Sequence, residues 1–395
     1  MIETALPMVQ LGDPVLVAQG PSEEKRWGWY QFPSIERHLD GRLLVKYQRA
    51  ADSALSYGEP PAVAVSNDEG LTWEPAECPD DPLFAHSAWG GGVLLPNGDR
   101  LQVKMLHSLP ADRVSLPPSI GHEDGTYGNT YDYYPAADLP PEMAGYHFLR
   151  RRAGTEEWVE ETATVRIPGA IRNVTEGVLT FPWIDRLRVG PDGTLWGIHY
   201  WKRVADYELL DKWAVFLLRS TDYGHTFDLH GEIRYRGDPL RHPGWTMHEG
   251  FTEPDVAFLP DGSLFCLMRT TDGIGVGPLY ASRSTDGGRA WSRPKVFDDR
   301  GVWPQLLTLG NGVTLAAYGR PGLYVRATAD PAAQAWGPRA EVLRASTVWS
   351  GTCAYSGLLA LDDRTALLVY SDFAHPGEDG QLCKAIKVRR VTVEV

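Results

Sequence analysis

Short runs of alternating apolar and polar residues dominate this chain, and no long helical pattern interrupts them. One element recurs six times: an apolar run, a tight turn of Asp-Gly or Asn-Gly type, and a second alternating run. Alternation with a period of two is typical of β-strands, and these dipeptides supply the positive φ of a tight hairpin. The pattern predicts six hairpins, whose turns lie at Asp40, Asn97, Asp192, Asp261, Asn311 and Asp362.

A second element, of the form S-x-D-x-G-x-T-W, follows most of the hairpins. Clear copies begin at Ser66, Ser220 and Ser284, and weaker copies end at Trp158 and Trp336. The Ser and Asp side chains of such a segment can bond the backbone of their own turn. We therefore interpret Asp68, Asp222 and Asp286 as structural residues rather than as catalytic ones.

Each hairpin with its following two-stranded unit makes one four-stranded antiparallel sheet. Radial repetition of such sheets is a β-propeller, and 395 residues over six sheets leave about 66 residues for each. The sequence thus predicts an all-β, six-bladed propeller that spans residues 1–395 as a single domain. The C-terminal run KAIKVRRVTVEV reads as a strand that closes the ring with N-terminal residues.

Composition narrows the function classes. Lys and Arg number 38 against 51 Asp and Glu, so the formal net charge is −13, which argues against nucleic-acid binding. No apolar stretch reaches the roughly 18 residues of a membrane span, and the N-terminal residues lack a secretory signal, so we expect a cytoplasmic protein. The four cysteines show no C-x-x-C spacing, and we expect no metal or cofactor. Fourteen Trp and 17 Tyr favour a carbohydrate partner.

Propeller topology also locates a candidate site. Because every hairpin turn lies on one face, the residues before the first strand and after the second meet at the other face. Tryptophan rings stack on sugars and Arg binds carboxylate, so this mouth is suited to an acidic or polyhydroxylated sugar. The predicted mouth residues are Gln31, Trp89, Trp183, Glu253, Trp303 and Tyr355 before the turns, and Arg49, His107, Trp201, Arg269, Arg320 and Asp372 after them.

The repeated S-x-D-x-G-x-T-W segment resembles the Asp-box of the sialidase superfamily, and the six predicted blades match that family over the whole chain. In the stretch FTEPDVAFLPDGSLFCLMR, the resemblance implies that Glu253 activates a tyrosine and that Arg269 grips a substrate carboxylate. The segment AYSGLL implies that Tyr355 is the nucleophile, and Arg320 matches a further gripping arginine.

The opening blade departs from the family pattern. Gln31 stands where the resembling enzymes carry the first arginine of a triad. Arg49 matches a second blade-one arginine, and Asp52 is the candidate acid/base, although it lies closer to Arg49 than the pattern expects. The resemblance implies a glycoside hydrolase that acts with retention on a sialic-acid-like or other acidic sugar.

A long insertion separates the second and third strands of the second blade, at about residues 107–145. No element is predicted within it, and its topology places it at the mouth as a lid or wall. We expect it to supply His107, Tyr127, Tyr131 or Tyr133 to the substrate.

Two other functions fit the same residues. A polysaccharide lyase would use Tyr and His to abstract a proton from a uronic acid, and His107 or His199 beside Tyr355 would favour it. A non-catalytic glycan-binding propeller would keep the Trp ring without needing the pair of Tyr355 and Glu253.

Overall fold

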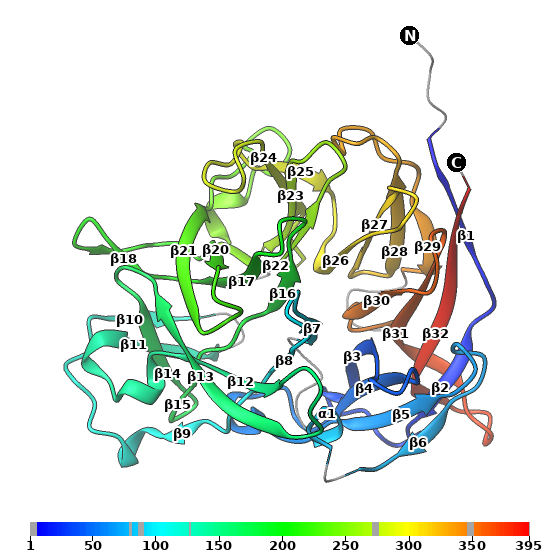
Figure 1. The fold of residues 1–395 in the computed structure, drawn as a ribbon, viewed down its shortest axis with the longest axis horizontal. Coiled ribbons are helices and arrows are strands. Elements are labelled where there is room, and N and C mark those ends of the chain that lie inside the picture. The colour runs from blue at the N-terminus through cyan, green and yellow to red at the C-terminus, as the bar shows by residue number, and fades with distance from the viewer. Residues whose placement is uncertain are drawn as a thin grey trace.

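The computed structural model describes residues 6–78, 81–85, 91–125, 128–270, 276–345 and 351–394. Strands make up nearly all of its regular structure, and the one α-helix among the described residues, α1 (Pro82–Ala85), has a single turn. Blades of antiparallel strands surround a central axis, as Figure 1 shows, and two neighbouring blades are joined into one eight-stranded sheet. The all-β, six-bladed propeller predicted from the hairpin repeats is confirmed.

The blades follow one another in chain order, each starting with its innermost strand. The first three blades are β3 (Trp29–Arg37), β4 (Leu43–Arg49), β5 (Ala62–Ser66) and β6 (Glu74–Ala76); β7 (Gly92–Leu94), β8 (Arg100–Val103), β12 (Tyr146–Arg151) and β13 (Trp158–Arg166); and β16 (Arg186–Val189), β17 (Leu195–Trp201), β20 (Ala214–Ser220) and β21 (Thr226–Ile233). Blades four and five are β22 (Phe251–Phe258), β23 (Leu264–Thr270), β24 (Leu279–Ser284) and β25 (Lys295–Asp298); and β26 (Val302–Thr308), β27 (Thr314–Gly319), β28 (Leu323–Thr328) and β29 (Ala340–Leu343).

The sixth blade joins the two ends of the chain. It contains β30 (Ser356–Ala360), β31 (Thr365–Pro376) and β32 (Leu382–Glu394), and β1 (Met8–Leu11) and β2 (Val15–Gln19) both pair antiparallel with β32. In Figure 1, β1 runs along β32 at the edge of the ring. The predicted closure of the ring by N-terminal residues is therefore confirmed.

Turn chemistry explains the regularity of the blades. The glycine of each Asp-Gly or Asn-Gly hairpin has a positive φ, for example 91° at Gly41 and 82° at Gly262. In the second repeated element, Ser66 Oγ donates to Asp68 Oδ1 at 2.8 Å and accepts the N–H of Gly70 at 2.9 Å. The Ser220–Asp222 and Ser284–Asp286 pairs repeat the first of these bonds at 2.8 Å. These aspartates therefore stabilise turns.

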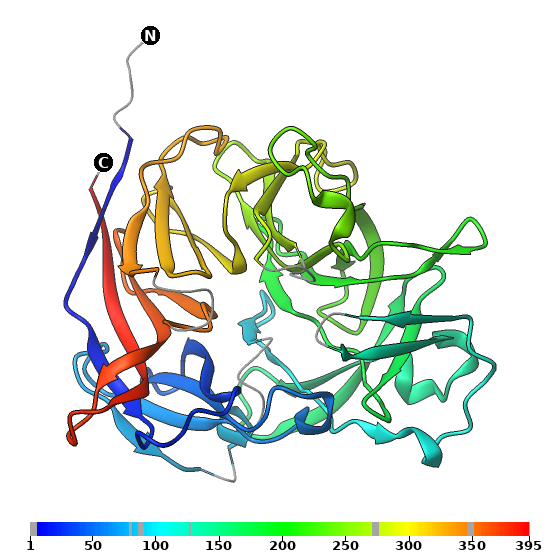
Figure 2. The same ribbon diagram turned by 180° about the vertical axis from the view of Figure 1, so that it is seen from behind.

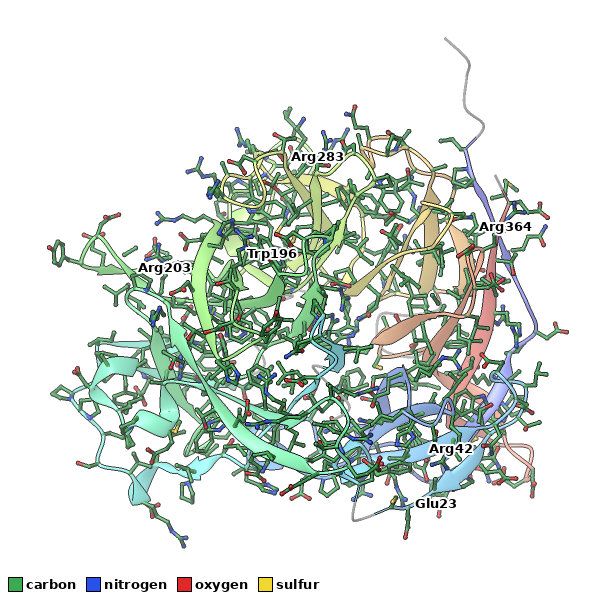
Figure 3. All side chains as sticks on the ribbon, viewed as in Figure 1. Glu23, Arg42, Trp196, Arg203, Arg283 and Arg364 are labelled. Atoms are coloured by element: carbon green, nitrogen blue, oxygen red, sulfur yellow. The ribbon has the colours of Figure 1, made fainter. Side chains whose placement is uncertain are left out.

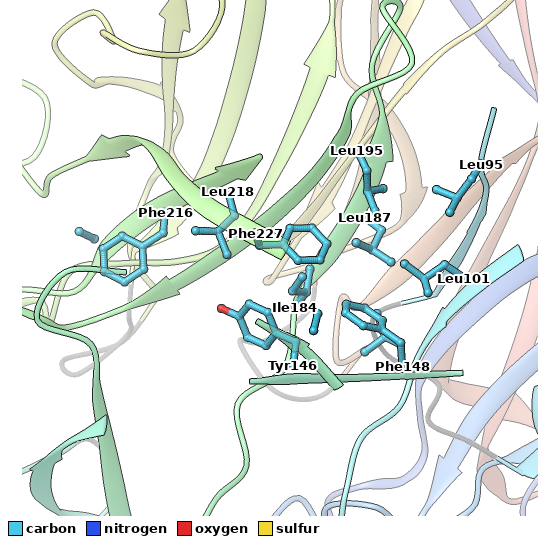
Figure 4. Close-up of a cluster of buried hydrophobic side chains, with 13 residues drawn as sticks. Leu95, Leu101, Tyr146, Phe148, Ile184, Leu187, Leu195, Phe216, Leu218 and Phe227 are labelled. Carbon is cyan, nitrogen blue, oxygen red and sulfur yellow. The ribbon is translucent and has the colours of Figure 1, made fainter. Parts of the chain in front are cut away.

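Hydrophobic clusters fill the seams between neighbouring blades. Between the second and third blades, Leu101 and Phe148 pack with Leu187, Phe216 and Phe227, as Figure 4 shows. Charged side chains such as Arg42, Arg283 and Arg364 lie apart from one another around the ring in Figure 3. Since each seam buries apolar side chains from two blades, the blades support one another, and the positions of their inner strands are fixed.

The insertion differs from its prediction. Its residues form β9 (Leu109–Pro110), β10 (Gly121–Asp124) and β11 (Thr130–Pro135), which join β14 (Ile171–Thr175) and β15 (Val178–Leu179) in a five-stranded sheet. We call this the added sheet. Figure 2 shows it beside blades two and three. The prediction that the insertion forms no element is thus wrong. Its strands are completed into a sheet by a second segment, which follows β13.

None of the helices in the described ranges has the length and apolarity to cross a membrane. The described residues also hold no group of three or more His, Cys, Asp or Glu side chains placed to bind a metal ion.

Candidate active site

A cavity of about 760 Å³ opens where the predicted mouth lies. Its polar lining includes Asp52, Glu176, His199, Arg269, Arg320 and Tyr355. Its aromatic lining includes Trp27, Tyr57, Tyr131, Trp183, Trp201 and Trp213. Both the propeller and the added sheet therefore contribute to its walls.

Tyr355 lies at the centre of a hydrogen-bonded group of buried residues. Its hydroxyl donates to Oε1 of Glu253, which also accepts from Nη1 of Arg269 at 2.5 Å. The second oxygen of Glu253 accepts the backbone N–H of Trp303 at 2.9 Å. Glu253 is only 5% exposed and lies behind Tyr355 rather than in the cavity lining. A carboxylate so placed can remove the phenolic proton without contacting the substrate itself.

A β-bulge in the innermost strand of blade four orients Glu253. The pairing of β22 with β23 shifts register between Thr252 and Asp255, and Glu253 has a φ of 48° immediately before a proline. The same shift occurs in blades one and five, where Phe32 and Trp303 have φ values of 51° and 48° and also precede prolines. The three residues occupy equivalent positions in their blades.

Burial and charge determine how Tyr355 ionises. Desolvation raises the pKa of its phenol well above 10, and the nearby Glu253 carboxylate raises this pKa further. Arg269 and Arg320 lower the same pKa, since they favour the phenolate. The phenol is therefore protonated at rest, and Glu253 is the base that it meets directly.

Asp52 shares the cavity with Tyr355. Its carboxylate accepts the indole N–H of Trp27 at 2.8 Å, and the guanidinium of Arg320 lies 5.3 Å from the centre of that indole. The surrounding cavity walls desolvate the carboxyl and so raise the pKa of Asp52, while the bond from Trp27 opposes this shift. A carboxyl with a raised pKa is suited to proton donation.

Arg269 and Arg320 both face the cavity as predicted from the sequence. Arg320 is 3% exposed, and its Nη2 donates to the carbonyl oxygen of Cys353 at 2.7 Å, which holds the guanidinium near Tyr355. Trp183 and Trp201 also line the cavity. Tyr131, predicted as part of a mouth wall, lines it from the added sheet.

Three predicted substrate-binding residues do not reach the cavity. Gln31 is fully buried, and its Oε1 accepts the N–H of Gly28 at 2.9 Å, because the bulge in β3 turns Phe32 toward Tyr355 instead. Arg49 is exposed, with its guanidinium 5.8 Å from the ring centre of Tyr30. His107 is also exposed and outside the lining.

Trp303 does not provide the sugar platform that was predicted for it. One face of its ring stacks on Tyr355, with centroids 4.7 Å apart, and the guanidinium of Arg186 lies 3.8 Å from the ring centre. These contacts keep the ring out of the cavity lining and make it a support for Tyr355. Tyr133 is also buried and donates to Glu123. Trp89 and Tyr127 lie outside the described residues.

Several cavity residues are not predicted from the sequence. Trp27 comes from the segment between β2 and β3, and Glu176 comes from the turn between β14 and β15. Neither segment belongs to the repeats, so no count from a hairpin turn leads to them. The high Trp and Tyr content of the chain is the one sequence signal for Trp27, and Glu176 has none.

No family model matches the sequence, and the search among curated proteins gave no match. Solved structures are similar in fold. A Dyadobacter fermentans protein of unknown function has 19% identity and a TM-score of 0.61, over 98% of this chain and 99% of that one. A Hadza microbial sialidase has 16% identity and a TM-score of 0.52, over 94% and 68% of the chains. A Penicillium chrysogenum α-L-arabinanase, complexed with arabinobiose, has 13% identity and a TM-score of 0.50, over 95% and 98%. The chain thus has a propeller fold that is also found in glycosidases.

Proposed function

We propose that this protein is a retaining glycoside hydrolase that uses Tyr355 as its nucleophile. One observation carries the proposal: the Tyr355 hydroxyl donates to the buried carboxylate of Glu253, while Tyr355 itself lines the cavity. A phenol next to a base is an activated nucleophile, and tyrosine nucleophiles are a known exception to the two-carboxylate scheme of glycosidases.

The proposed reaction has two steps. In the first, a bond forms between Tyr355 Oη and the anomeric carbon, and the glycosidic C–O bond breaks. Glu253 takes the phenolic proton, and Asp52 donates a proton to the leaving oxygen. In the second step, Asp52 takes a proton from a water molecule that attacks the anomeric carbon, the Tyr355–sugar bond breaks, and Glu253 returns its proton to the departing Tyr355 oxygen. Two displacements at one carbon retain its configuration.

The proposed substrate is an acidic sugar. Arg269 and Arg320 both line the cavity close to Tyr355, and guanidinium groups bind carboxylates through paired hydrogen bonds. A substrate carboxylate would also repel a carboxylate nucleophile, which favours a phenol. In blade one, the apolar Phe32 stands at the mouth, where the resembling enzymes carry the first arginine of a triad. This site would therefore hold the acid with two arginines rather than three. The sialidase fold of a structural neighbour is consistent with this assignment, whereas the arabinanase neighbour favours a neutral sugar.

A lyase is the second candidate, because His199 and Tyr355 line the same cavity. In that reaction Tyr355 or His199 would abstract a proton beside a uronic-acid carboxylate held by Arg269. The product would be an unsaturated uronate, which absorbs in the ultraviolet, whereas hydrolysis creates no such chromophore.

A substrate panel tests the proposal. The purified protein is incubated with 4-methylumbelliferyl glycosides of N-acetylneuraminic acid, its deaminated analogue, glucuronic acid, L-rhamnose and L-arabinofuranose. We expect release from an acidic sugar by the wild type and no release by Tyr355→Phe. Release from a neutral sugar alone would reject the acidic substrate. An unsaturated product from a uronic-acid polymer would replace the hydrolase with the lyase.

A further inference from the structure

The wall of the cavity that blade three forms has a different chemistry from the Tyr355 side. In a ring of six, blade three lies opposite blade six, which carries Tyr355 next to its first strand. On this wall, His199 of β17 lines the cavity, and its Nδ1 lies 2.7 Å from Oδ2 of Asp185. Asp185 is 3% exposed, and its backbone N–H donates to the carbonyl oxygen of Ile198 at 3.1 Å. The backbone that carries this carboxylate is thus itself held by β17.

This arrangement determines which His199 nitrogen is available. A carboxylate on the Nδ1 side keeps the proton on Nδ1, so Nε2 of the neutral ring is a hydrogen-bond acceptor. In the part of the chain that the structure describes, Nε2 has no hydrogen-bond partner from the protein. An oriented acceptor in a cavity wall is suited to a hydroxyl group of a ligand.

Trp201 lies two residues after His199 on β17, and other aromatic rings surround it. The ring centroids of Trp201 and Trp213 are 5.0 Å apart, and Tyr131 of the added sheet meets both rings edge-on. All three line the cavity. Aromatic faces and a few oriented polar groups are typical of sugar subsites, because a sugar ring presents both C–H faces and hydroxyl edges.

The size of the cavity also fits a longer ligand. Its volume of about 760 Å³ lies high in the range of roughly 300–1,000 Å³ that is usual for ligand pockets. The groups proposed to react, Asp52, Arg269 and Tyr355, come from blades one, four and six, so blade three and the added sheet supply a part of the lining that takes no part in the proposed reaction.

We propose that the blade-three wall is a second sugar subsite, in which Nε2 of His199 accepts a hydrogen bond from a hydroxyl of the sugar on the leaving-group side. The inference rests on the proposed hydrolase function and extends it: the substrate is an oligosaccharide rather than an isolated glycoside. Asp185 is a positioning residue in this scheme, and Trp201, Trp213 and Tyr131 supply the apolar surfaces.

The test compares two leaving groups on one sugar. The probes are 4-methylumbelliferyl N-acetylneuraminic acid and 3′-sialyllactose, and kcat and KM are measured for both. We expect His199→Ala to raise KM for sialyllactose roughly tenfold, the loss of about one good hydrogen bond, with kcat nearly unchanged. For the methylumbelliferyl substrate, which has no second sugar, we expect no change beyond about twofold.

Two further variants separate binding from folding. His199→Ala leaves the buried Asp185 without its partner, so the double variant His199→Ala/Asp185→Asn removes the pair together and should show the same selective KM change. His225→Ala is the matched control, since His225 lies on an exposed turn of the same blade and should leave both substrates unaffected.

The outcomes are distinct. Equal KM changes for both substrates, or a change for neither, would overturn the second subsite and leave the hydrolase standing. If the wild type released no acidic sugar from these two compounds or from the panel above, the acidic-sugar proposal would fail and this inference would fail with it.

Discussion

The two sides of the cavity are built in different ways. On one side, Arg269 and Tyr355, with Glu253 behind Tyr355, come from strands or strand starts of the repeated blades. On the other side, Tyr131, Asn129 and Glu176 come from the added sheet. The first set is joined by direct hydrogen bonds between buried groups, whereas the second faces the cavity from turns and from a strand that has no counterpart in the other blades.

In the proposed function, the blade side carries out the chemistry, and the added sheet contributes to the choice of substrate. A group that transfers protons needs fixed distances, which the packed inner strands provide. The added sheet has no equivalent in the other blades, so its residues can change without disturbing the ring. The two sides meet where Glu176 accepts the backbone N–H of Ala54 at 2.7 Å and the hydroxyl of Ser53 at 2.9 Å, directly after Asp52.

The largest effect is expected on the blade side. Tyr355→Phe removes the nucleophilic oxygen, and we expect kcat to fall by at least about a thousandfold while the dissociation constant for product sugar stays within severalfold. Steady-state kinetics and calorimetry measure the two quantities. Tyr47→Phe is the control, because Tyr47 packs on Tyr30 outside the cavity. Unchanged turnover in Tyr355→Phe would show that Tyr355 is not the nucleophile.

The second-largest effect is expected for Glu253→Gln. The amide keeps the size of the side chain but cannot take the phenolic proton, so we expect kcat to fall about 10²–10⁴-fold. The same substitution also removes the negative partner of Arg269. Thermal unfolding of the variant shows whether the fold is intact, and a folded variant with nearly normal kcat would exclude Glu253 as the base.

We expect Asp52 to set the alkaline limit of the reaction. Its raised pKa keeps the carboxyl protonated to higher pH than an ordinary aspartic acid, so proton donation persists to that pH and declines above it. In Asp52→Asn, we expect kcat/KM for sialyllactose to fall about 10²-fold or more and to lose this alkaline decline. A methylumbelliferyl leaving group needs less protonation, so its kcat/KM should fall much less. Equal losses for both substrates would assign Asp52 another role.

A smaller effect is expected where the two sides meet. Glu176→Ala removes the acceptor for Ser53 and Ala54 and so loosens the Asp52 segment. We expect kcat to fall severalfold, roughly the value of one or two hydrogen bonds. Glu23→Ala, at an exposed position outside the cavity, is the control. Full activity of Glu176→Ala would show that the added sheet does not position Asp52.

Outside the cavity, a blade turn should affect stability alone. The Thr72 hydroxyl and other donors of the turn lower the pKa of Asp68 to about 2. Its contribution to stability is therefore present above the ordinary pKa of about 4 and is lost as pH falls toward 2. We expect Asp68→Ala to melt lower than the wild type at neutral pH, to melt closer to it near pH 2, and to keep its kcat. A change in kcat would show that blade turns influence the site.

The sequence allowed the blade side to be predicted far better than the other side. Glu253, Arg269 and Tyr355 were found because hairpin turns recur and because strand geometry fixes the distance from turn to mouth. Errors within this side came from contacts that a count cannot reveal. The bulge in β3 replaces Gln31 with Phe32 at the mouth.

The added sheet could not be predicted in the same way. Its strands come from two segments separated by β12 and β13, and pairing between distant segments leaves no local repeat in the sequence. Glu176 and the His199–Asp185 pair likewise depend on contacts between elements. What the sequence did indicate was that Tyr131 belongs to a wall of the mouth.

The most direct test of the central claim is to trap the covalent intermediate. The wild type is treated with a fluorinated analogue of the sugar that the panel identifies, and the labelled peptide is located by mass spectrometry. We expect one sugar adduct, on Tyr355, and no adduct in Tyr355→Phe. A stable adduct on Glu253, Asp52 or another carboxylate would contradict it.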